Sequence, residues 1–334
     1  MSVLAIRLAA AAVVLLLALL TPLEAIACGM PLRARIPAEQ ALIIYSGDRQ
    51  QIITSVQLEA TEPGAAVVFP VPGVPEVELI SGGDQLFSWL EEATKPTERV
   101  QQRVRWRDDD TVGGRPTGGV SLLGRELLGG YDVARLAAND PGELLQWLQQ
   151  NGYSVPAAMQ PALDAYVAEG WKFVAVRLAD DAPASGALAP LGISFPATQI
   201  VYPLRFAALA DRPLDLQLYV LSDHRVEIDG MQTLFAGPAA QLSPPPVAEL
   251  AQLMATAPFL TKLRNPAVDP ATVKGDLMPR RAANDELYRE VVTVYRYVSP
   301  TAAYGLPLAL GCGVMLNVIA IAGAIAIRKR IDRI

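Results

Sequence analysis

The chain has little of the side-chain chemistry on which most enzymes and metalloproteins depend. Its 334 residues include one histidine and two cysteines, and only 19% of them are charged. One histidine excludes a site built from several imidazoles, and two cysteines exclude a disulfide-rich miniprotein and a cysteine cage for a soft metal. The sequence also contains no P-loop, dinucleotide-binding fingerprint or Ser-x-x-Lys motif. We therefore predict that the protein is not an enzyme and uses no cofactor and no metal.

Long hydrophobic runs occur only at the two ends of the chain. Residues 1–27 contain 22 apolar residues, and residues 302–327 contain 20. The rest has the apolar content of an ordinary globular domain, which excludes a transporter with many spans and a disordered chain. Five of the 28 basic and two of the 34 acidic residues lie at the ends (1–27 and 328–334), which leaves 23 and 32 in the body. The resulting net charge of −9 argues against nucleic acid and anionic lipid as partners.

The N-terminal run is typical of an export signal. The apolar stretch from Leu8 to Leu20 is too short to span a bilayer comfortably and matches the hydrophobic region of a signal peptide. Ala25 and Ala27 supply the small residues that precede a cleavage site, so residues 1–27 are predicted to be removed before Cys28. Cys28 is then either an unmodified thiol after ordinary cleavage, which we favour, or a lipidated residue.

The C-terminal run is typical of a membrane anchor. Residues 302–327 carry no charge, and residues 328–334 form a basic tail. This pattern predicts a single transmembrane helix with its C-terminus in the cytoplasm, in contact with the lipid bilayer. The expected location is the plasma membrane, with residues 28–300 as an extracytoplasmic body. Small residues and one amide at four-residue spacing predict a helix-association face made of Gly305, Ala309, Gly313 and Asn317.

The body alternates between strand and helix signals in blocks. Period-two patterns predict strands over 52–58, 100–106, 171–178, 214–220 and 287–298. Caps, prolines and terminal glycines predict helices over 84–94, 140–152, 156–169 and 246–256. Because the elements do not alternate regularly as in a βα repeat, we predict an α+β fold of mainly antiparallel β-sheet with inserted helices.

Several motifs in the body occur in the order found in one exported bacterial family. The run from Phe69 to Val77 reads Phe-Pro-Val-Pro-Gly-Val-Pro-Glu-Val, and Glu39 to Ile44 precedes it. Further motifs are Asn151-Gly152-Tyr153, Gly170 to Val176, Val201 to Arg205 and Asp223-His224-Arg225. In these segments the chain resembles the domain of unknown function numbered 2330. The resemblance covers residues 28–230, before a helical and β extension over 240–300, and it implies an exported protein without implying an activity.

Three arginines alternate along the predicted strand near residue 104. Arg103, Arg105 and Arg107 share one face, and three guanidinium groups in a row form a candidate anion-binding face. The alternative, which we favour, is a solvent-exposed face neutralised by the acidic run from Asp108 to Asp110.

The proline-rich run is a second candidate site. Prolines cannot donate hydrogen bonds in a sheet and favour extended backbone, so Phe69, Pro70, Pro72 and Pro75 form either a recognition strip or a rigid crossover between strands. We favour the crossover.

The single histidine lies between Asp223 and Arg225 at the end of a predicted strand. Neighbouring residues of a strand point to opposite faces, so Ser222, Asp223 and His224 do not form a catalytic triad among themselves. We expect a structural role for His224.

These features predict a non-enzymatic binding or scaffold subunit of a cell-envelope complex. The expected partner is either another envelope protein or a second copy of the chain. The alternative is an envelope hydrolase, which would need two carboxylates facing each other across a pocket.

Overall fold

The computed structural model describes residues 30–32, 34–35, 38–56, 59–60, 66–80, 83–104, 126–128, 131–138, 140–153, 155–178, 190–210, 212–246 and 248–298. The chain divides into a larger unit within residues 1–95 and 115–289 and a smaller unit within residues 96–114 and 290–334. The predicted signal peptide, membrane helix and basic tail lie outside the described residues. Among the residues that are described, no helix has both the length and the apolar composition needed to cross a membrane.

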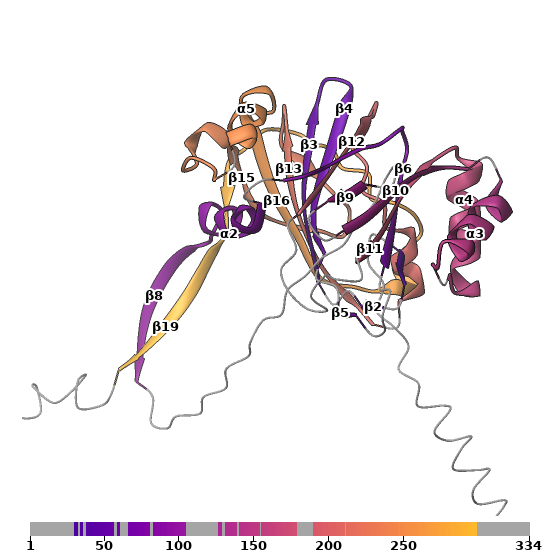
Figure 1. The fold of residues 1–334 in the computed structure, drawn as a ribbon. Coiled ribbons are helices and arrows are strands. Elements are labelled where there is room, and N and C mark those ends of the chain that lie inside the picture. Colours follow the sequence, from indigo (N-terminus) through magenta and orange to yellow (C-terminus); the bar gives the residue numbers. More distant parts are fainter. Residues whose placement is uncertain are drawn as a thin grey trace, which may run out of the picture. The chain divides into compact units, whose positions relative to one another are not determined.

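Two sheets form the larger unit (Figure 1). The eight-stranded sheet has the order β18 (Tyr288–Arg289), β15 (Gln232–Pro238), β16 (Phe259–Val268), β13 (Leu214–Ser222), β3 (Ala38–Ser46), β4 (Arg49–Val56), β12 (Leu191–Pro196) and β7 (Glu76–Leu79). The five-stranded sheet has the order β1 (Met30–Leu32), β6 (Ala66–Val71), β11 (Lys172–Leu178), β10 (Tyr131–Ala137) and β9 (Glu126–Leu128). Short pairs join β14 (Val226–Glu227) to β17 (Arg280–Arg281) and β2 (Ala34–Arg35) to β5 (Glu59–Ala60).

Helices occupy four of the predicted positions. They are α2 (Gly83–Ala93), α3 (Pro141–Gln150), α4 (Gln160–Ala168) and α5 (Ala248–Thr256), with 3₁₀ turns η1 (Ala157–Met159), η2 (Arg205–Leu209), η3 (Ala239–Gln241) and η4 (Pro270–Thr272). The Asp140 side chain accepts the Glu143 N–H at 3.1 Å and so caps α3, as the sequence pattern predicts. Within the larger unit only β13 and β3 pair in parallel, among the pairs that the described residues form. The predicted α+β class with mainly antiparallel sheet is therefore confirmed.

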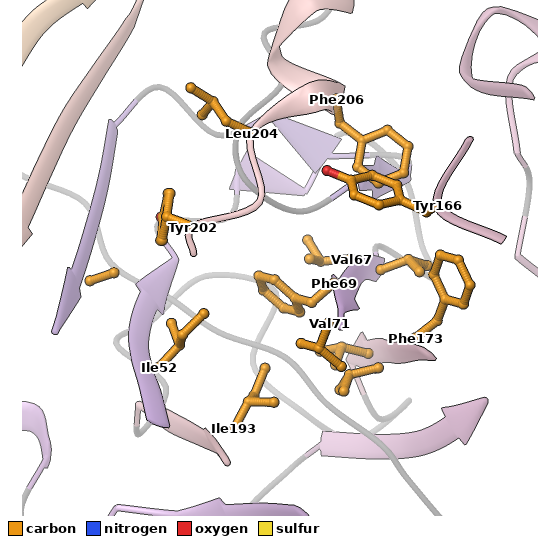
Figure 2. Close-up of a cluster of buried hydrophobic side chains, with 14 of the residues drawn as sticks. Ile52, Val67, Phe69, Val71, Tyr166, Phe173, Ile193, Tyr202, Leu204 and Phe206 are labelled. Carbon is orange, nitrogen blue, oxygen red and sulfur yellow. The ribbon is translucent and has the colours of Figure 1, made fainter. Parts of the chain in front are cut away.

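The main core lies between the two sheets (Figure 2). Phe69 of β6 contributes to it together with Ile52 of β4 and Ile193 of β12. Strand β6 is buried along its whole length, and Phe173 to Val176 of β11 are buried as well. Both faces of this sheet are therefore covered, one by the eight-stranded sheet and the other by α3 and α4 (Figure 1).

A second core lies on the opposite face of the eight-stranded sheet. Leu42 and Ile44 of β3 and Tyr219 of β13 point to this face and pack against Leu86 of α2 and Leu250 of α5. Strand β3 therefore alternates between two cores, because its odd- and even-numbered residues face different layers.

The described part of the smaller unit is a ribbon of two parallel strands. Strand β8 (Thr97–Val104) pairs with β19 (Val291–Val298) in unbroken register from Thr97↔Val291 to Val104↔Val298. The expected extracytoplasmic body over residues 28–300 stays a prediction.

Phe173 tests the two-sheet core. Its ring is fully buried, so Phe173→Ala is expected to destabilise the protein by about 3–5 kcal/mol through lost contacts and a cavity. Val74→Ala is the matched control, because Val74 is 69% exposed, and it is expected to change stability by less than about 0.5 kcal/mol. Urea unfolding measures both variants; equal losses would contradict the described core.

Candidate functional site

Segments from distant parts of the sequence line one cleft of about 670 Å³. Its lining includes Pro72 after β6, Trp171 before β11, Pro196 at the end of β12, Arg205 of η2 and Met278. Pro72, Trp171 and Arg205 belong to motifs that carry the family resemblance. The cleft therefore brings together three separate motifs of the sequence.

A buried glutamine holds one wall of this cleft. The Gln50 side chain donates to the Val201 carbonyl at 2.6 Å and accepts the Val201 N–H at 2.9 Å, which reproduces the pairing of a neighbouring strand. The Ala197 N–H donates to the Asp48 carbonyl at 2.8 Å. The β3–β4 hairpin thus positions the segment from Ala197 to Val201.

Arg205 is the central charged group of the cleft. Its two terminal nitrogens donate to both carboxylate oxygens of Glu169, at 2.6 and 2.7 Å, and its Nε lies 2.8 Å from Asp276 Oδ2. The guanidinium carbon lies 4.6 Å from the ring centroid of Tyr166 and 5.8 Å from that of Trp171. The hydrogen bonds with Glu169 raise the pKa of Arg205, and the nearby Asp276 charge adds to this effect. Arg205 is therefore a permanently charged group held in a fixed orientation.

Asp276 supports this arrangement from behind. Its side chain is 1% exposed, and Oδ1 accepts the Tyr166 hydroxyl and the backbone N–H groups of Leu204 and Arg205, the latter two at 2.9 and 3.3 Å. A buried carboxylate is tolerated when donors and a cation surround it, as they do here. Asp276 therefore joins α4 and η2 to a loop far along the chain.

The aromatic residues around Arg205 form one packed group. The Tyr166 ring lies 4.8 Å from Trp171 and 5.4 Å from Phe206, in tilted geometry between ring centroids. Figure 2 shows Tyr166 and Phe206 side by side. Trp171 is only 7% exposed, so the cleft is bounded by a rigid aromatic base rather than by a free side chain.

The proline-rich run passes along the cleft but is mostly interior. Phe69, Pro70 and Pro75 are buried, Pro72 is half-buried and Val74 is 69% exposed. The predicted recognition strip therefore offers Pro72 to the cleft, and whether it recognises a partner stays a prediction.

A second cleft, of about 550 Å³, lies on the face of the eight-stranded sheet that α2 and α5 cover in part. Its polar residues are paired across the strands: Arg49 donates to Glu76 at 2.8 Å and Gln51 to Glu78 at 2.7 Å. Only one residue of the family motifs, Glu76, lines this cleft, whereas residues of three motifs line the first. We therefore take the first cleft as the candidate site.

The other predicted sites are distributed as follows. Of the candidate anion-binding face, Arg103 belongs to β8 and is paired with Tyr297 in the strand register. Arg105 and Arg107 lie outside the described residues. Outside them lie also Cys28 and the predicted helix-association face, which is made of Gly305, Ala309, Gly313 and Asn317. Among the described residues, no group of three or more His, Cys, Asp or Glu side chains is arranged to hold a metal ion.

His224 pairs with a distant residue and not with its neighbours. Its Nδ1 lies 3.1 Å from Asp285 Oδ2, while Ser222 Oγ donates to the His224 carbonyl oxygen at 2.6 Å. Asp285 also accepts the Arg225 N–H, and these hydrogen bonds lower the pKa of Asp285. The contact therefore links a turn to the segment before β18. The Ser222 hydroxyl binds the backbone of His224 and not its imidazole ring.

Sequence reasoning did not select Glu169, Arg205 or Asp276 as site residues. Arg205 and Trp171 had a signal, since both lie in family motifs. Asp276 had none, because its partner Tyr166 is 110 residues away in the sequence.

Comparisons with known proteins support a family but no activity. A family model described as an uncharacterized protein conserved in bacteria (DUF2330) matches residues 22–280, which include Asp276. No curated protein matches the chain in sequence. Among solved structures, the crystal structure of baculovirus P35 is similar at a TM-score of 0.36 and 9% identity, over 78% of this chain and 97% of that chain. A likeness at this score carries no argument about fold or function.

Asp276→Ala tests the support of the site. The substitution removes the buried acceptor of the Tyr166 hydroxyl and of the Leu204 and Arg205 N–H groups, so a loss of about 3–5 kcal/mol is expected in urea unfolding. Asp229 is the matched control: it pairs with Arg280 but is 84% exposed, so Asp229→Ala is expected to leave the unfolding curve unchanged. A similar small effect from both would show that Asp276 does not hold the cleft.

Gly73 tests the close approach of the proline-rich run to the cleft wall. A Cβ at Gly73 would lie 2.8 Å from the Pro196 carbonyl oxygen, so Gly73→Ala is expected to cost about 1–3 kcal/mol through forced backbone movement. A Cβ at Gly275 would meet nothing within 4 Å, which makes Gly275→Ala the control. The same unfolding measurement applies, and a neutral Gly73→Ala would argue against the contact.

Proposed function

The chain belongs to DUF2330, a family of uncharacterized proteins conserved in bacteria, and from this premise we propose that it is a non-enzymatic binding subunit of a cell-envelope complex. In this proposal the N-terminal signal directs export and residues 302–327 anchor the chain in the plasma membrane. The body lies outside the cytoplasm and holds an apolar segment of a partner protein in the cleft around Trp171 and Arg205.

The convergence of motifs on the cleft carries this proposal. Pro72, Trp171 and Arg205 come from three motifs and line one concave surface. The cleft has a volume of several hundred Å³ and a mixed lining of apolar and polar side chains, and a concave surface of this size is the usual form of a binding site.

The exposed side chains at the cleft favour an apolar partner. Met278 is 48% exposed, and Pro72 and Pro196 present ring carbons beside it. Arg205 uses two of its five N–H groups in hydrogen bonds to Glu169, and its Nε lies beside Asp276 in an ion pair. A backbone carbonyl of an extended partner segment would complement the remaining donors, while a partner side chain packs on the proline and methionine carbons.

The charges of the cleft favour binding over the hydrolase alternative. A hydrolase of the kind considered needs one carboxylate that holds a proton and another that is free to act as base or nucleophile. Of the two carboxylates that line the cleft, Asp48 and Glu169, Glu169 is bound by Arg205 through both oxygens. The buried Asp276 accepts hydrogen bonds through Oδ1 from groups of the chain itself. Carboxylates held by partners within the chain suit a fixed binding surface.

A photo-cross-linker at the cleft tests this proposal. Met278 is replaced by a benzophenone amino acid in the full chain, and cells are irradiated before their membranes are isolated. We expect a discrete adduct with one envelope protein, detected by a mass shift and identified by mass spectrometry, because Met278 lies at the exposed side of the cleft.

Gln232 provides the matched position for the cross-linker. It is exposed, lies at the start of β15 and does not line the cleft. The proposal predicts no such adduct from Gln232. An identical adduct pattern at both positions, or none at Met278, would contradict the proposed use of the cleft.

A further inference from the structure

One carboxylate at the cleft around Arg205 is not used by the fold. Asp48 lies in the turn between β3 and β4, lines the cleft and is exposed. Aspartates in turns commonly accept a nearby backbone N–H. The Asp48 carboxylate, in contrast, takes part in no hydrogen bond and no ion pair among the described residues. The turn therefore forms without this charge, which stays available at the cleft.

The lining of the cleft has an excess of negative charge. Its charged side chains are those of Asp48, Glu169 and Arg205, and Arg205 binds Glu169 through both carboxylate oxygens. These two charges offset each other, so Asp48 is the one that is left uncompensated. The body as a whole also carries more acidic than basic residues, 32 against 23. The cleft therefore repels an anionic group and attracts a cationic one.

The rest of the exposed lining suits an extended peptide segment. Pro72, Pro196 and Met278 present carbon atoms at the cleft. Thr198 and Gln199 are exposed and uncharged, and their backbone N–H groups form no hydrogen bond among the described residues. These donors are therefore available to the backbone carbonyls of a partner segment, beside a surface on which an apolar side chain can pack.

A basic side chain fits the Asp48 charge better than a metal ion does. The described residues contain no group of three or more His, Cys, Asp or Glu side chains arranged to hold a metal, and Glu169 is already bound by Arg205. Lysine and arginine combine a cationic head with an aliphatic stem. A single carboxylate beside exposed carbon atoms complements both parts of such a side chain.

We propose that the partner segment held by the cleft carries a lysine or arginine next to the apolar residue that packs on Met278. The basic group lies against Asp48, and the apolar side chain lies on Met278 and the proline rings. This inference rests on the proposed function, because it names the chemistry of the segment that the cleft would hold. A second copy of this chain fits less well, since two bodies with an excess of acidic residues repel each other.

Charge reversal at Asp48 tests this inference in the full chain. The cross-linking experiment at Met278 is repeated with Asp48→Lys and with Asp48→Asn, which removes the charge with little change in shape. Because Asp48→Lys replaces attraction by repulsion, it is expected to lower the adduct yield at least about fivefold, and Asp48→Asn by a smaller factor. Glu286→Lys is the matched control: Glu286 is exposed and does not line the cleft, so the same change in net charge is expected to leave the yield unchanged.

Two further measurements use the same variants. The Asp48 carboxylate bonds no other described group, so Asp48→Lys and Asp48→Asn are expected to unfold in urea as the unmodified chain does. The purified full chain, kept in detergent, is also applied to an array of short random peptides. It is expected to retain peptides in which lysine or arginine adjoins an apolar residue, and the Asp48→Lys chain is expected to lose this preference.

The outcomes separate this inference from the proposal on which it rests. Equal adduct yields from Asp48→Lys and Glu286→Lys, or a cross-linked partner segment without a basic residue, would overturn the inference and leave the proposed function standing. Absence of any adduct at Met278 would contradict the proposed function, and the peptide array then decides the inference alone: no preference for basic peptides would overturn it. An adduct between two copies of this chain would overturn it as well.

Discussion

The buried carboxylate of Asp276 is the group on which the candidate site depends. It accepts hydrogen bonds from Tyr166 and from the backbone of Leu204, and its charge is matched by Arg205. A carboxyl group that is only 1% exposed is tolerated because these donors and the Arg205 guanidinium lie against it. The same contacts position Arg205 and the aromatic base. Loss of these contacts would therefore change both the shape of the cleft and its charge pattern.

The result is a surface whose central charges are already satisfied within the chain. Arg205 and Glu169 fix each other, so the cleft offers orientation and apolar contact more than a mobile charge. The exposed apolar side chains of β19, which are Val291, Val292 and Tyr295, do not line this cleft.

Much of the fold was accessible from local patterns. Asp140, Pro141 and Gly152 mark the ends of α3 because capping and left-handed turns are decided by a few adjacent residues. Alternation located β4, β11 and β13, but it did not show that β11 is buried on both faces, since burial of the second face depends on α3 and α4. Nor did it show that β8 and β19 pair in parallel, because no local signal joins residues 97 and 291.

By itself the sequence determined the class of the fold, its family resemblance and most helix boundaries, because these follow from periodicity, caps and motif order over short distances. It also supplied the expectations of export and anchoring, from two apolar runs and a basic tail. Only the tertiary structure decided which charged residues form a site. Tyr166, Arg205 and Asp276 meet through side-chain contacts between segments up to 110 residues apart, and electrostatic partners at that separation leave no periodic trace in the chain.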